Sequence, residues 1–159
     1  KIIIVLLPHP SIVTRSVWSF NLKSEFELMR SAIVSHPLIS TMDTEFSDDV
    51  VHFHPALRQP EHNYAVLKAN VDHLHLVQVG FTLSNHAGNL PSFGISDQFI
   101  WEFNFREFDV TCDPHAPDSI PLLPRQGIDF EQNHRFGVEI MRFAELMMYS
   151  GLVCNNNVH

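Results

Sequence analysis

Two segments with strict apolar–polar alternation constrain the fold of this chain more than any other feature. In residues 76–83, Val and Phe alternate with Gln, Gly and Thr, and in residues 99–108 aromatic residues alternate with mostly polar ones. A period of two predicts strands that bury one face, and it favours antiparallel pairing. Residues 84–98 between them are rich in Asn, Gly, Pro and Ser, which is typical of a long hairpin loop. We therefore expect two paired strands with an aromatic face toward the core.

Three other segments have apolar residues at helical spacing, which predicts helices over residues 19–36, 64–74 and 136–150. Ser19 is a candidate N-cap of the first, Pro37 ends it, and Gly151 ends the third. We interpret Met141, Met147 and Met148 as core packing rather than a cofactor site. The expected core-facing residues of the three helices are Leu22, Phe26, Met29 and Ile33; Leu67, Val71 and Leu74; and Ile140, Phe143, Ala144 and Met147.

The remaining segments complete an α/β pattern. Residues 38–46 are expected to form a strand, and residues 47–62 and 109–133 are expected to be mostly loop. The second loop contains a short helical turn that begins at Asp118 and is ended by Pro124. The resulting order is α, β, α, β, β, α. Three strands with one helical layer leave a sheet still open, so the sequence has the pattern of part of a domain.

Composition excludes several classes of protein. Lys plus Arg is 10 against 18 for Asp plus Glu, so the formal charge is −8, and with three lysines a broad basic surface for nucleic acid is excluded. Any nucleic acid would have to enter a local cleft, with a cation bridging to the protein. No apolar run approaches the ~18 residues of a membrane span. Cys112 and Cys154 are too few for a disulfide framework, and we expect a reducing, intracellular setting.

The strongest candidate for chemistry is the pair Asp43 and Glu45 at the end of the strand expected over 38–46. Residues i and i+2 of a strand point to one face, so both carboxylates project together. Two such groups repel unless a cation compensates them, and hard divalent cations bind paired carboxylates. A two-metal site of this kind cleaves phosphodiesters. The alternative is a solvated acidic pair, which is a common surface feature.

Two weaker candidates have structural alternatives. His52 and His54 share a face if their segment is extended, and Asp48 and Asp49 lie nearby, so a metal site is one interpretation and a polar histidine-rich loop is the other. The aromatic residues of 99–108 could stack on RNA bases, but we favour a core-facing role because the opposite face is already polar.

A series of motifs in this chain resembles the Caf/Pop-type deadenylases, the poly(A)-shortening subunits of the CCR–NOT complex. The matching segments are RxVWxxNLxxEF at 15–26, MDTEF at 42–46, LKANVD at 67–72, VQVGFT at 77–82, WEFNF at 101–105, DPHAPDSI at 113–120, GIDF at 127–130, FAELM at 143–147 and SGLV at 150–153. They cover residues 11 to 154 in register, and the segment 113–120 resembles plant members. Residues 1–10 are unmatched.

The resemblance implies a ribonuclease-H-like fold of the DEDD exonuclease superfamily. By resemblance, Asp43 and Glu45 are catalytic residues and the first two of four acidic metal ligands; the other two aspartates and a histidine lie in motifs that the family carries beyond this chain's end. Residues 11–159 are then the N-terminal part of a single nuclease domain, an antiparallel three-strand portion with flanking helices. Two departures stand out: Ser47-Asp48 replaces the family's Pro-Gly beside the metal, and Phe20 replaces a polar residue.

The function implied by the resemblance is a metal-dependent 3′→5′ exoribonuclease that shortens mRNA poly(A) tails and releases 5′-AMP. Magnesium is the expected cation, poly(A) RNA and CCR–NOT subunits the expected partners, and no membrane is involved. Such an enzyme would act in mRNA decay and transcription regulation in nucleus and cytoplasm. No residue is assigned to RNA binding.

The 159-residue chain by itself is expected to be inactive, because half of the metal ligands are missing from it. Alternatives to the enzyme stay open. A non-catalytic CCR–NOT adaptor or a degenerate nuclease copy would have the same motifs. A histidine-rich metal binder would instead hold zinc through residues 48–54.

Overall fold

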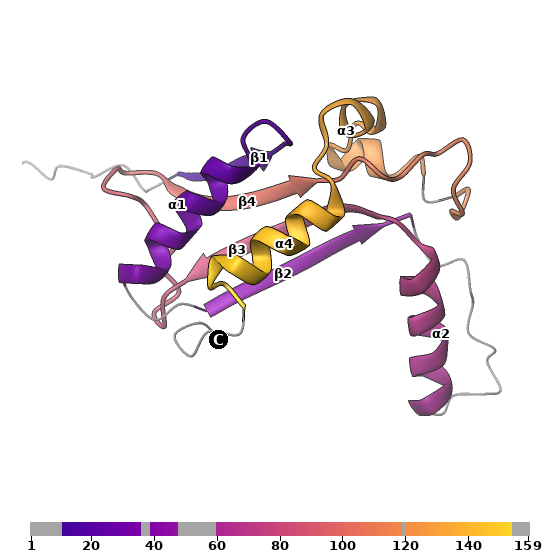
Figure 1. Cartoon of the computed structure of the whole chain (residues 1–159), viewed down its shortest axis with the longest axis horizontal. Coiled ribbons are helices and arrows are strands. Elements are labelled where there is room, and N and C mark those ends of the chain that lie inside the picture. The colour runs from indigo at the N-terminus through magenta and orange to yellow at the C-terminus, as the bar shows by residue number, and fades with distance from the viewer. Residues whose placement is uncertain (1–10, 36–38, 48–59, 119, 154–159) are drawn as a thin grey trace, which may run out of the picture.

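The computed structural model of the chain describes residues 11–35, 39–47, 60–118 and 120–153. Figure 1 shows a sheet crossed by helices, with one helix standing away from it. In chain order the elements are β1 (Ile12–Val17), α1 (Leu22–Ser35), β2 (Ile39–Phe46), α2 (Pro60–His73), β3 (Leu76–Ser84), β4 (Gln98–Asn104), the 3₁₀ helix η1 (Leu123–Gln126), α3 (Phe130–Phe136) and α4 (Ile140–Ser150).

The four strands lie in the order β1-β4-β3-β2. β3 pairs antiparallel with both β4 and β2, which confirms the expected antiparallel portion of three strands. β1 adds a fourth strand, parallel to β4, which the sequence did not predict. Of its six residues only Val17 is buried, so β1 lacks the alternation that marks the inner strands. The α/β fold class is unchanged by this addition.

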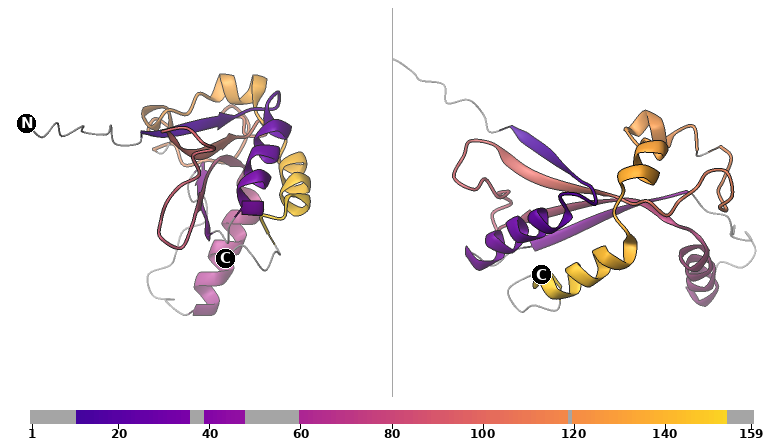
Figure 2. Two further views of the ribbon diagram at one scale, coloured as in Figure 1. Left: turned by 90° about the vertical axis from the view of Figure 1, so that its left-hand side faces the viewer. Right: turned by 45° about the horizontal axis from the view of Figure 1, so that its top comes forward.

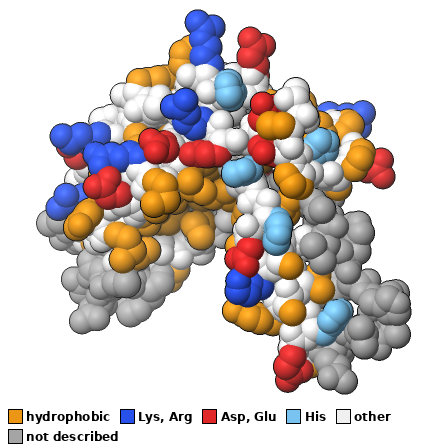
Figure 3. All heavy atoms as spheres, turned by 45° about the vertical axis from the view of Figure 1, so that its right-hand side comes forward, with side chains coloured by type: hydrophobic (Ala, Val, Ile, Leu, Met, Phe, Trp, Pro, Cys, Tyr) orange, Lys and Arg blue, Asp and Glu red, His pale blue; other side chains and the backbone are white. Residues whose placement is uncertain are grey.

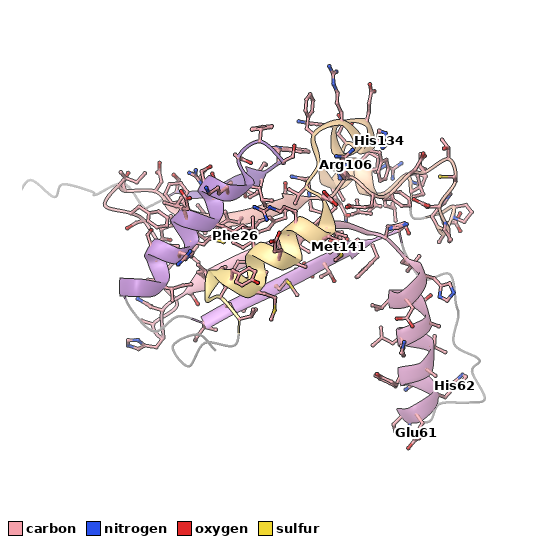
Figure 4. All side chains as sticks on the ribbon, viewed as in Figure 1. Phe26, Glu61, His62, Arg106, His134 and Met141 are labelled. Atoms are coloured by element: carbon pink, nitrogen blue, oxygen red, sulfur yellow. The ribbon has the colours of Figure 1, made fainter. Side chains whose placement is uncertain are left out.

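The hydrophobic core lies between one face of the sheet and the helices α1 and α4. Figure 2 shows both helices on the same side of the strands. The alternating side chains of β3 and β4 are buried there, as expected: Val79, Phe81 and Leu83; and Phe99, Trp101 and Phe103. Val77, at the start of β3, is buried in a second cluster with Phe108, Leu123 and Ile128. Phe26 of α1, labelled in Figure 4, has its ring centroid 5.6 Å from that of Phe103 and 6.0 Å from that of Phe143 of α4. These aromatic contacts join the two helices to the sheet.

The ends of several elements differ from the expectation. α1 begins at Leu22 rather than residue 19, because Ser19 does not cap it: its hydroxyl and its amide both bond to the carbonyl of Phe136. α2 begins at Pro60, four residues before the expected start, since proline is tolerated in the first turn of a helix. β4 ends at Asn104, and Phe105, though buried, forms an isolated bridge with Val138 instead.

The segment expected to be loop over 109–133 contains helices. The turn expected at Asp118 is not helical; the 3₁₀ helix η1 lies further on and has Pro124 in its first turn. α3 was not predicted at all, although Asp129 accepts a hydrogen bond from the amide of Gln132 and caps it. An Asp followed three residues later by Gln is a capping signal that could have identified this helix. α4 then begins at Ile140 instead of residue 136.

The predicted core face of α2 is wrong, and that of α4 is right except at Ala144. Leu67 and Val71 of α2 are 58% and 54% exposed, and this helix buries Val66 and Asn70 instead. α2 projects from the end of the sheet where β2 ends and β3 begins (Figure 1), and neither Leu67 nor Val71 belongs to a core cluster. On α4, Ala144, Met141 and Met148 are exposed, whereas Phe143 and Met147 are buried as expected.

Candidate metal site and the pocket beside it

Asp43 and Glu45 lie on β2 at positions two residues apart and therefore share a face of the sheet. The antiparallel register places Asp43 opposite Gly80 and Glu45 opposite Gln78 of β3. These partners alternate with the buried residues Val79 and Phe81, so the two carboxylates project from the face that α1 and α4 do not cover. The structure thus brings together the two residues that the sequence singled out.

The sheet leaves space next to Asp43. Gly80 has no side chain, and a Cβ atom built there would stand 3.9 Å from the Cβ of Asp43. On its other side Gly80 pairs with Glu102 of β4, whose carboxylate belongs to the same face. A larger residue at position 80 would stand between Asp43 and Glu102. The glycine therefore keeps this part of the face open.

β2 is irregular directly after Glu45. The pairing with β3 shifts between Glu45 and Phe46, as at a β-bulge, so that Phe46 pairs with Leu76. Bulges bend a strand and redirect its side chains, and they are common beside active sites. Asp43 accepts a hydrogen bond from the amide of Thr44 at 3.1 Å, which orients its carboxylate.

A pocket of about 350 Å³ opens beside Glu45. It is lined by the end of β2, by one side of α2, and by the segment around η1: Thr44, Glu45, Phe46, Leu67, Asn70, Val71, Leu74, Leu122, Leu123 and Gln126. Figure 3 shows hydrophobic side chains along α2 and on the body of the molecule, with a hollow between them. Leu67 and Val71 of α2, which were expected in the core, thus line a pocket next to Glu45, a candidate metal ligand.

The donor set of this strand end fits a hard divalent cation. Mg²⁺ binds through one or two carboxylates and keeps several waters, and Asp43 and Glu45 supply two carboxylates on one solvent-facing surface. Within the described residues, no group of three or more His, Cys, Asp and Glu side chains is arranged to hold a metal ion.

The motif at 15–26 has a structural role rather than a catalytic one. Arg15 of β1 donates to both oxygens of Glu25, and Trp101 donates its ring N–H to the same buried carboxylate at 3.0 Å. Asn21 accepts from the amide of Trp18 and donates to the carbonyl of Ser16, which shapes the turn into α1. These side chains fasten the first helix to the sheet.

The residues of the alternative histidine-rich metal site, His52, His54, Asp48 and Asp49, lie outside the described residues. Phe20 is exposed at the turn before α1. Within the part of the chain that the structure describes, none of the helices has the length and apolar character needed to cross a bilayer.

Sequence reasoning missed two contributors to this site. One is Gly80, which appeared only as a polar-face position of a strand. The other is the wall formed by Leu67 and Val71, whose helical spacing was assigned to the core. Helical spacing identifies the apolar side of a helix but gives no signal for which neighbour that side will meet.

Comparison with known proteins supports a relationship along nearly the whole chain. The chain is 45% identical over 157 residues to "Probable CCR4-associated factor 1 homolog 7" of Arabidopsis thaliana, covering 98% of this chain and 57% of the relative. It is 41% identical over 145 residues to "Poly(A) ribonuclease pop2" of Schizosaccharomyces pombe, covering 91% and 42%. No family model matches.

Solved structures agree with these relatives. The S. pombe Pop2p structure in its Mg²⁺- and Mn²⁺-bound form has a TM-score of 0.80 at 40% identity, over 91% of this chain and 56% of that one. A yeast structure of the NOT1 MIF4G domain co-crystallized with CAF1 has a TM-score of 0.68 at 34% identity, over 92% and 51%. The chain therefore spans about half the length of the proteins that it matches.

Proposed function

This chain belongs with the CCR4-associated factor 1 and Pop2 proteins, and from that premise we propose that it is the metal-ligating first part of a 3′→5′ exoribonuclease that shortens poly(A) tails and releases 5′-AMP. The observation that carries the proposal is the placement of Asp43 and Glu45 on one open face of β2, beside a pocket. That S. pombe Pop2p was solved with Mg²⁺ and Mn²⁺ supports a divalent cation at this position.

Asp43 and Glu45 would hold the cations, for which magnesium is our proposal. A bound pair of divalent cations activates a water and stabilises the leaving oxygen in phosphodiester hydrolysis. The chain's own contribution is to keep both carboxylates on one side of the strand and to leave the space above Gly80 clear. The acidic face also makes a cation necessary, since a phosphodiester would otherwise meet two negative charges.

We further propose that the pocket beside Glu45 accepts a nucleobase. Its walls include Leu67, Val71 and Leu122, which offer apolar surface for the face of a ring. Gln126 adds an exposed side-chain amide, and such an amide is able to pair with the N6 and N7 edge of adenine. A pocket with both features suits an adenine-rich single strand whose phosphate lies near Asp43.

A chimera tests this function. Residues 11–153 replace the matching part of the S. pombe poly(A) ribonuclease, and release of 5′-AMP from a labelled oligo(A) is measured with Mg²⁺. We expect hydrolysis that Asp43→Asn and Glu45→Gln each reduce by at least about a hundredfold, as loss of a member of a joint catalytic unit does. A folded chimera that is inactive, or that is unaffected by both substitutions, would contradict the proposal.

A second function, docking to a CCR–NOT scaffold, is supported by the surface of α4. Met141, Met148 and Tyr149 are 71%, 64% and 78% exposed, an unusual set of large hydrophobic side chains on one helix. The NOT1 MIF4G domain was co-crystallized with a CAF1 relative of this chain. We propose a NOT1-type MIF4G domain as the partner that binds the exposed surface of α4 formed by Met141, Met148 and Tyr149.

The docking proposal is tested by retention of the 159-residue chain on an immobilised NOT1 MIF4G domain. Met141→Glu with Met148→Glu should abolish retention, and Glu131→Lys on α3 is the charge-changing control. Unchanged retention of the double variant would place the interface elsewhere. We also propose that this chain acts in mRNA decay and transcription regulation, in the nucleus and the cytoplasm.

A further inference from the structure

The strand that carries the candidate metal ligands ends in a buried serine. Ser47 directly follows the irregular pairing after Glu45, and its side chain is shielded from solvent although Asp43 and Thr44 on the same strand are exposed. A buried hydroxyl requires a hydrogen-bond partner. The Ser47 Oγ donates to the carbonyl oxygen of Pro114, 67 residues further along the chain, at 3.1 Å.

A second hydrogen bond joins the same two segments. The carbonyl oxygen of Ser47 accepts from the amide of Ala116 at 3.2 Å. Ser47 thus bonds to the loop through both its side chain and its backbone. Only the side-chain bond depends on residue type, because it requires a side-chain donor at position 47.

The loop that receives these bonds is itself held in place. Asp113 accepts from the amide of Asp109 through Oδ2 at 2.7 Å, and its Oδ1 lies 3.7 Å from Nε2 of His75, just before β3. His115 Nδ1 lies 2.9 Å from the carbonyl oxygen of Asp113, and its ring meets the buried ring of Phe108 edge-on. These contacts hold the loop of residues 109–116 near the start of β3. The hydrogen bond from Ser47 to Pro114 therefore joins the end of β2 to a fixed segment.

We propose that Ser47 is a positioning residue for Glu45: its hydroxyl fixes the end of β2 so that the carboxylates of Glu45 and Asp43 keep one arrangement toward a divalent cation. The inference rests on the proposed function, because it takes these two residues as cation ligands. Ligands held in place by neighbouring hydrogen bonds bind more tightly than ligands that must first be ordered. Loss of the hydroxyl should therefore reduce the free energy of cation binding by more than it reduces the free energy of unfolding.

The test measures Mn²⁺ binding to the 159-residue chain by paramagnetic broadening of the Thr44 and Gly80 amide resonances. Ser47→Ala should raise the apparent Kd by about threefold to tenfold, which corresponds to the loss of one hydrogen bond. The matched control is Ser150→Ala. Ser150 is also buried, donates to the carbonyl of Met147 at 2.6 Å and accepts from the amide of Leu152 at 2.9 Å at the end of α4. The control should lose stability without changing the Kd.

A second variant covers the case in which Ser47→Ala does not fold. Ser47→Cys keeps nearly the same volume with a weaker donor, so it should raise the Kd in the same direction. If the wild-type chain binds Mn²⁺ at Asp43 and Glu45 but neither variant changes the Kd, the inference is overturned and the proposed function stands. If Thr44 and Gly80 show no broadening in the wild-type chain, the proposed function fails and the inference fails with it.

Discussion

Arg15 on β1 and Glu25 on α1 are joined by two hydrogen bonds, Nε to Oε2 at 2.6 Å and Nη2 to Oε1 at 2.7 Å. Glu25 is only 5% exposed, and its carboxylate raises the pKa of Arg15. Arg15→Ala would leave a buried carboxylate without its cation. We predict a loss of roughly 2–4 kcal/mol in the free energy of unfolding, below the cost for a fully buried pair because Arg15 is partly exposed.

Urea unfolding measures this loss, with Arg15→Lys as the comparison. Lysine keeps the charge but lacks the planar fork that reaches both oxygens, so it should recover only part of the stability. Equal stability of the Ala variant and the wild-type chain would show that the pair does not fasten α1 to the sheet.

Gly137→Ala should destabilise the chain more than Gly88→Ala. A Cβ at position 137 would stand 2.3 Å from the carbonyl oxygen of Asn133 and 2.7 Å from the amide nitrogen of Arg106, both backbone atoms that cannot turn away. At position 88 a Cβ meets nothing within 4 Å, and the cost is that of a positive φ of 81°. We predict a loss above roughly 2 kcal/mol at position 137 and about 1 kcal/mol at position 88. Thermal unfolding of both variants measures these losses. A larger loss for Gly88→Ala than for Gly137→Ala would contradict the close backbone contact at position 137.

The pKa of Asp109 lies below its usual value, because the hydroxyl and then the amide of Thr111 donate to its carboxylate. A lowered pKa means that this group stabilises the fold above the usual aspartate range and that the contribution disappears as the pH falls through the lowered value. Thr111→Val should raise the pKa of Asp109, as measured by an NMR titration. Thr111→Ser keeps the hydroxyl and should leave the pKa low; a rise in the Ser variant would assign the shift to another cause.

The 159-residue chain without a complement should not shorten oligo(A). Two carboxylates supply part of a two-cation site, and members of a joint catalytic unit contribute little when the rest is missing. Incubation of the purified chain with Mg²⁺ and labelled oligo(A) measures this directly. Mg²⁺-dependent shortening that Asp43→Asn abolishes would show that the chain is catalytically sufficient.

The strands were predictable where one face is buried and the other is not. Val79 and Phe103 alternate with polar neighbours because β3 and β4 lie inside the sheet, and the same logic placed Asp43 and Glu45 on one face. β1 escaped prediction because Val17 is its only buried side chain, so its sequence lacks the alternation of β3 and β4.

The features that were not predicted depend on contacts between residues far apart in sequence. Leu67 is at helical spacing with other apolar residues, but whether it meets a core or a pocket depends on where α2 lies relative to the sheet. The hydrogen bond from Ser47 to Pro114 has no local signal, since a serine after a strand is equally compatible with an exposed turn. Local patterns define which face is apolar, whereas tertiary structure decides what that face meets.

The central claim is that Asp43 and Glu45 together bind a divalent cation, and Mn²⁺ broadening of backbone amide resonances tests it most directly. In the wild-type chain, Mn²⁺ should broaden the resonances of Thr44 and Gly80 first, because these residues flank the two carboxylates in the sheet. The double variant Asp43→Asn with Glu45→Gln should lose that broadening while keeping its remaining spectrum. Equal broadening in the wild-type chain and the double variant would contradict the account.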